Sequence, residues 1–155
     1  MAIRTRVKIT DTDRGLAKVL SLQDEPRRTI RLGWDEESGE EHGVSMVELA
    51  TVHELGTATV PARHPLLRAA NATSPQAEKA LEKLASGALG KGAKLKEGLE
   101  QVARETEQAA KEYLRGGPYL APPLAPQTVA DKGQARPILD TGALIESLKA
   151  KVEVK

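Results

Sequence analysis

The stretch RTIRLGW, residues 28–34, decides the fold class because its apolar residues occupy every second position. An alternation of period two is typical of a strand with one buried face. The same period appears in IRTRVKI, residues 3–9, and in KAKVEVK, residues 149–155. Strands near both ends, with helical patterns between them, predict a single α+β domain over residues 1–155. Its small antiparallel or mixed sheet includes the N- and C-terminal strands and packs with helices.

The middle of the chain carries helical patterns. Ser45 is placed to cap a helix of about ten residues, and Gly56 stands where that helix would end. From about 75 to 115 the apolar residues recur in helical phase, and Pro75 suits the first position of this long amphipathic helix. Glycines each weaken a helix by about 1 kcal/mol relative to alanine, so we expect a bend or break between 87 and 92. Shorter helices are expected between Thr12 and Pro26 and at 66–72.

Two segments lack a core-facing pattern. Residues 35–43, DEESGEEHG, hold five carboxylates and two glycines, which predicts a solvated acidic loop. Residues 116–139 are rich in proline and glycine and predict an extended arm without periodicity. After this arm, Asp140 or Thr141 is placed to cap a short helix that runs through Ser147.

Composition narrows the classes of function. The net charge of +1 lacks the basic excess of a dedicated nucleic-acid binder. The chain has no cysteine, which excludes thiolate metal sites and thiol nucleophiles and fits a reducing compartment. No apolar run approaches the roughly 18 residues of a membrane span, so we expect a soluble protein that is intracellular when made. The near absence of aromatic residues favours tight helix packing over a large ligand pocket.

The pair His53–Glu54, followed by His64, raises the question of a metal-dependent hydrolase. Zinc proteases place two histidines four residues apart on one helix, but the fourth residue after His53 is Thr57. His42, His53 and His64 are eleven residues apart, yet the intervening glycines and prolines exclude one continuous helix. We therefore expect no catalytic residue, metal or cofactor here. The alternative interpretation is that His53 and Glu54 form local hydrogen bonds that fix a helix end.

The segment ALGKGAKLKEG offers a second candidate for chemistry. Its glycines and lysines lack the GxxxxGK[ST] spacing of a phosphate loop and follow no strand, so a flexible basic stretch is the simpler interpretation. Lys91, Lys94 and Lys96 are kept as residues that could face a DNA backbone.

Three stretches, in the same order, resemble a family of bacteriophage proteins. VELATVHELGT, 47–57, is similar to a family helix that ends in Ala-x-x-x-His-Glu-Phe-Gly, and VPARHPLLRAA, 60–70, is similar to Pro-Ala-Arg-Pro-Phe-Leu-Arg. The segment 122–154 resembles the family's Pro-Leu-x-x-x-Thr, Pro-Leu-x-Asp-Thr-Gly and Leu-x-x-Ser ending. The family is the head–tail joining and tail-completion proteins, also called virion morphogenesis proteins, of long-tailed phages.

The resemblance implies a structural protein of the phage neck or tail end, made in the bacterial host cytoplasm. Such a protein forms a ring, as a hexamer matching the sixfold symmetry of the tail. Its partners would be its own copies, connector or adaptor proteins, the tail tube or tail terminator, and viral DNA in the lumen, with no membrane. A tail terminator that caps the tail tube is an alternative, and a small metal-dependent hydrolase is another. The motif residues are expected to hold backbone turns and subunit contacts: His53, Glu54, Gly56, Pro61, Arg63, Pro65, Asp140, Thr141, Gly142, Leu144 and Ser147.

Overall fold

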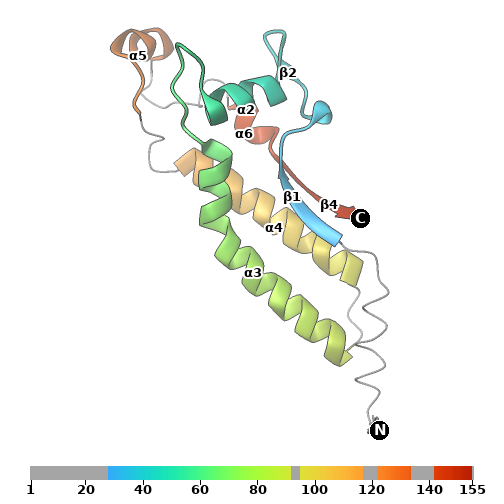
Figure 1. Ribbon diagram of the computed structural model, residues 1–155. Helices are drawn as coiled ribbons and strands as arrows, with labels where there is room; N and C mark the ends of the chain where they lie inside the picture. The colour runs from blue at the N-terminus through green and yellow to red at the C-terminus, as the bar shows by residue number, and fades with distance from the viewer. Residues whose placement is uncertain (1–27, 92–94, 117–121, 134–141, 155) are drawn as a thin grey trace, which may run out of the picture.

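The computed structural model describes residues 28–91, 95–116, 122–133 and 142–154. Two long helices, α3 (Pro65–Lys91) and α4 (Leu95–Gly116), lie side by side (Figure 1). Three shorter helices gather at one end of this pair: α2 (Met46–Leu55), α5 (Pro126–Lys132) and α6 (Ala143–Glu146). A small sheet packs on α4, so the predicted α+β class is confirmed. The strand expected at 3–9 and the helix expected before Pro26 lie outside the described residues.

The sheet joins segments from opposite ends of the described chain. β1 (Arg28–Gly33) pairs antiparallel with β4 (Lys149–Val154), so that Leu32 lies opposite Ala150. Both strands were expected from their period of two, and their pairing confirms that the C-terminal strand belongs to the sheet. One face packs against α4, while Arg31 and Lys151 on the other face are exposed.

The acidic segment 35–43 is more ordered than a solvated loop. Asp35 caps a 3-10 turn, η1 (Glu36–Ser38), by accepting the N–H of Glu37 at 3.1 Å. A short β-hairpin follows, in which β2 (Glu40–Glu41) pairs antiparallel with β3 (Val44–Ser45). Its turn residues, His42 and Gly43, both have positive φ, as a tight hairpin turn requires. The segment contains no buried residue, as expected of a solvated acidic loop, but local capping and turn geometry give it short regular elements that were not predicted.

Two connected clusters form the core. In the first, Met46 and Ala50 of α2 pack against Leu144 and Ile145 of α6. The second joins α3, α4 and the residue before β4 through Ala69, Ala110 and Leu148, each with no exposed surface. Trp34 and Leu114 contact both clusters. Trp34 thus links the end of β1 to the helices, which explains why the alternating stretch that contains it matters for the fold.

Helix α3 runs through Pro75, whereas a helix start was expected there. A proline in a helix interior removes one hydrogen bond and costs roughly 3 kcal/mol. Asn71, whose carbonyl loses its partner, is exposed, so water can reach that carbonyl. Packing of α3 along α4 offsets the remaining cost. In Figure 1 the first turns of α3 run at an angle to the rest of the helix, as a proline kink would produce.

A bend or break was expected between 87 and 92, but α3 continues to Lys91, so Gly87 lies inside α3. α4 begins at Leu95, and residues 92–94 between the two helices lie outside the described part of the chain. Gly98 also lies inside a helix, at a close contact between α3 and α4. A Cβ atom there would come within 2.2 Å of the Leu84 Cδ1 atom. Gly98 thus permits close packing of the two helices, although it weakens α4 locally.

The proline-rich segment 116–139 is not an unstructured arm throughout, because it contains α5. Pro126 occupies the first turn of that helix, and Gly133 ends it in the left-handed conformation. Proline at the start and glycine after the end are favourable helix boundaries. The N-cap of α6 is Gly142, not Asp140 or Thr141, and those two residues lie outside the described part of the chain.

No helix in the described ranges is both long enough and apolar enough to cross a membrane.

Candidate functional site

The side chain of Glu54 closes the junction between α2 and α3. Its two carboxylate oxygens accept the backbone N–H groups of Leu66 at 2.9 Å and Leu67 at 3.2 Å. These N–H groups belong to the first turn of α3, where no carbonyl within the helix can accept them. A negative charge at this position also interacts favourably with the helix dipole. Glu54 therefore acts as a capping group for α3, supplied from the last turn of a different helix.

The backbone beside Glu54 crosses back over the end of α2. The carbonyl of His53 accepts the N–H of Arg63 at 2.8 Å and that of His64 at 3.3 Å. His64 has a φ of 53°, and its carbonyl accepts the first helical N–H of α3, from Arg68, at 3.0 Å. The hypothesis that the His–Glu pair fixes a helix end is consistent with this geometry. The carbonyl of His53 and the carboxylate of Glu54 together hold two helix ends, the C-terminus of α2 and the N-terminus of α3.

Gly56 makes this tight crossing sterically feasible. Its φ of 78° and ψ of 176° lie in a region that is essentially restricted to glycine. A Cβ atom would lie 2.7 Å from the backbone nitrogen of Ala62 and 2.9 Å from the carbonyl oxygen of Val60. The helix ends at Gly56 as expected, but ψ there is extended and not that of the left-handed turn common at helix ends. Pro61 lies in the returning segment, and Pro65 is the first residue of α3.

Arg63 is a buried cation at the centre of the junction. Only 3% of its surface is exposed, and burial lowers the pKa of its guanidinium. Its Nε atom donates to the carbonyl of Pro122 at 3.1 Å, and its Nη1 atom donates to the carbonyl of Pro61 at 3.3 Å. These contacts are to backbone carbonyls and not to Glu54, whose oxygens hold the start of α3. Arg63 thereby joins the α2–α3 crossing to the segment that leads into α5.

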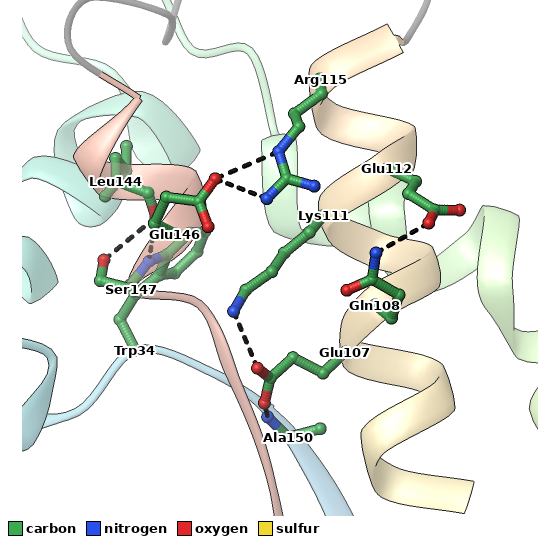
Figure 2. Close-up of polar contacts among 10 residues, drawn as sticks. All are labelled: Trp34, Glu107, Gln108, Lys111, Glu112, Arg115, Leu144, Glu146, Ser147 and Ala150. Carbon is green, nitrogen blue, oxygen red and sulfur yellow. Dashed lines mark hydrogen bonds and ion pairs between the residues drawn. The ribbon is translucent and has the colours of Figure 1, made fainter.

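The C-terminal motif supplies a second fixed turn. Gly142 has a φ of 87°, and its carbonyl accepts the N–H groups of Ile145 and Glu146, each at 3.0 Å. Leu144 is buried, and its carbonyl accepts the indole N–H of Trp34 at 2.8 Å. The hydroxyl of Ser147 donates to the same carbonyl at 3.1 Å. The motif therefore attaches α6 to the end of β1 (Figure 2).

Helix α4 carries the ion pairs that hold α6 and β4. Arg115 binds Glu146 with Nε–Oε1 at 3.1 Å, and this contact lowers the pKa of Glu146 (Figure 2). Glu107 accepts Lys111 Nζ at 2.8 Å on one oxygen and the N–H of Ala150 at 2.9 Å on the other. Burial alone would raise the pKa of Glu107, but these bonds lower it overall. Sequence analysis missed this pair, although the spacing of four residues on a helix was a readable signal.

The other candidate groups are dispersed. His42 lies in the β2–β3 turn, His53 in α2 and His64 before α3. Within the described ranges, no three histidine, aspartate or glutamate side chains are grouped so that they could hold a metal ion. The Nδ1 atom of His64 lies 4.0 Å from Glu54 Oε1, at the outer limit of an ion pair.

Of the three lysines in the basic stretch, the structure describes only the side chain of Lys96. Lys96 is 78% exposed and lies 4.0 Å from Glu100, one turn along α4. Lys94 lies outside the described residues, and of Lys91 the structure places only the backbone, at the end of α3. The three lysines remain candidates for DNA contact.

Comparisons with protein-family models, with curated proteins and with solved structures found no match to this chain.

Proposed function

We propose that this chain is a non-enzymatic structural subunit of a bacteriophage neck, which forms a ring and joins or completes the tail at the head–tail interface. The observation that carries the proposal is the use of the Glu54 carboxylate. Both of its oxygens accept backbone N–H groups of α3, so the residue that most suggested catalysis has a structural role in helix capping. The motif that resembles the phage family therefore forms a structural joint between the end of α2 and the start of α3.

The surface around this joint suits contacts between subunits. Leu55 is 72% exposed and Leu67 is 53% exposed, and they lie at the end of α2 and the start of α3. Val47 on α2 is 37% exposed. Leu55 and Leu67 flank the same junction, and exposed apolar residues that lie together support a protein interface, whereas isolated ones carry no such meaning. A ring subunit needs such a surface, because each copy must bury part of it against a neighbour.

The hydrolase alternative has less support from this geometry. A general base must have a lone pair directed at a water molecule or substrate. In Glu54 both carboxylate oxygens already accept a backbone hydrogen bond, and removing either bond would leave an uncapped N–H at the start of α3. The tail terminator remains a related role within the same assembly.

The direct test is deletion of the gene from the phage or prophage that encodes it, followed by electron microscopy of the particles. We expect filled heads and separate tails, with joining restored when the protein is supplied from a plasmid. A complementing Glu82→Gln variant, altered at an exposed position on α3, serves as the matched control. Intact, infectious virions formed without the protein would refute the proposal.

A further inference from the structure

The two edges of the β1–β4 sheet differ in their free hydrogen-bonding groups. On the β4 edge, the N–H of Ala150 donates to Glu107 of α4 at 2.9 Å. This N–H therefore points away from β1, which makes Leu32–Ala150 a non-hydrogen-bonded pair of the antiparallel ladder. Because such pairs alternate, Ile30–Val152 is of the same kind. Ile30 and Leu32 thus direct their backbone N–H and C=O groups toward the outer edge of β1.

Nothing in the described part of the chain pairs with that outer edge, since β4 is the sole strand beside β1 there. Exposed strand edges are usually protected or used to bind another strand. The β4 edge is protected by Glu107, which belongs to α4. The β1 edge instead borders a groove, which suggests that it is used.

The groove is a cavity of about 310 Å³ between the end of β1 and helix α2. Its apolar lining comes from three elements and comprises Leu32, Trp34, Val47, Ala50, Leu55 and Leu66. An extended segment pairing with β1 would place alternate side chains into this groove. The occupant that fits is therefore a strand with apolar residues at every second position.

Charge in the groove lining is mixed, with Arg31 and Glu54, while the segment that follows Trp34 along the chain is acidic. The segment 35–41 continues directly from β1, and its 3-10 turn packs on α2. It carries five carboxylates, of which Asp35 and Glu37 bind Lys151. Glu36 and Glu40 are exposed, and their negative charge would attract a positively charged segment and disfavour an acidic one.

One stretch of this chain has both properties. Residues 3–9, IRTRVKI, place Ile3, Val7 and Ile9 on one face and carry three basic side chains between them. We propose that residues 3–9 of a neighbouring copy add as a strand to the outer edge of β1, with their apolar face in the groove. This inference rests on the proposed function, because a ring needs a head-to-tail contact between two different surfaces of each copy. The strand and the groove are two such surfaces.

Amide hydrogen exchange of the full-length chain, read by NMR, tests this contact at single residues. At concentrations where ultracentrifugation detects oligomers, we expect the Ile30 and Leu32 amides to exchange at least about 100-fold more slowly than in dilute protein. The Arg31 amide points toward β4 in the alternating ladder and should keep the same rate, which makes it an internal control.

A variant with Ile3→Ser, Val7→Ser and Ile9→Ser should lose both the oligomers and the added protection. A synthetic peptide of residues 1–12 should then restore protection of Ile30 and Leu32 in this variant, and the same peptide carrying the three serines should not. Restoration by the natural peptide alone would show that the groove selects the apolar face of this strand.

Three outcomes would overturn the inference. Protection that is independent of concentration would mean that each chain uses its own strand. Oligomers in which Ile30 and Leu32 remain unprotected would mean that another surface forms the ring, and this would leave the proposed function intact. Absence of oligomers together with no binding of the peptide would remove the contact altogether, while the gene-deletion test would still decide the proposed function separately.

Discussion

Replacing Glu54 tests whether the His–Glu pair is scaffold. Glu54→Ala removes both acceptors from the N–H groups of Leu66 and Leu67 and removes a charge from the start of α3. Loss of a capping side chain costs about 1 kcal/mol, and loss of a favourable charge at a helix end costs up to about 1 kcal/mol more. We therefore expect the free energy of unfolding to fall by about 2 kcal/mol. For a domain of this size the melting temperature should fall by about 4–8 °C.

Urea unfolding followed by circular dichroism measures this change. Glu54→Gln keeps an acceptor oxygen but loses the charge, so it should lie between the wild type and Glu54→Ala, at a loss of about 1 kcal/mol. Glu82→Gln, at an exposed position on α3, is the matched control and should change stability by less than about 0.5 kcal/mol. If Glu54→Ala were as stable as the control, the capping argument would be refuted.

Four further substitutions test other parts of the structure by the same unfolding assay, and one of them also by proteolysis. Gly56→Ala should destabilise the chain by about 2–4 kcal/mol, because its Cβ would meet backbone atoms at a positive φ, whereas Gly87→Ala has open space in a helix and should stabilise it by about 0.5–1 kcal/mol. Arg63→Met should cost about 1–3 kcal/mol and speed proteolysis after Leu124, since it releases the segment held at the Pro122 carbonyl; unchanged proteolysis would contradict the contact. The folded-state pKa of Glu107 is lowered, so its stabilising contribution should be present above its ordinary pKa of 4.5 and be lost as the pH falls below it. Glu107→Gln should flatten this acid dependence, and an unchanged slope would count against the ion pair.

The elements that the sequence predicts well are those with local signals. Period two located β1 and β4, and Ser45 was correctly expected to cap α2, where its hydroxyl accepts the N–H of Glu48 at 3.1 Å. These features depend on neighbouring residues along the chain, so single-sequence reasoning can find them.

Errors arose where tertiary packing or a weak boundary signal decided the outcome. Pro75 suited a helix start locally, but packing along α4 carries α3 through it. The α5 helix was missed because the surrounding prolines suggested an extended arm, although Pro126 and Gly133 are favourable helix boundaries. These two boundary residues were visible in the sequence, but the abundance of proline around them led to the wrong prediction.

The candidate site was identified by its residues but not by its contacts. Glu54 reaches N–H groups that lie 12 and 13 residues further along the chain, and Arg63 reaches a carbonyl 59 residues away. Contacts across such separations depend on how the chain turns at Gly56. The end of α2 at that glycine could be expected from sequence, but the direction of the returning segment could not.

Counting this protein in purified virions by quantitative mass spectrometry tests the central claim most directly. The account predicts a fixed number of copies per particle, about six if one ring follows the symmetry of the tail, and recovery of these copies with the neck after the virion is disrupted. Particles that are complete and infectious but contain none of this chain would contradict it.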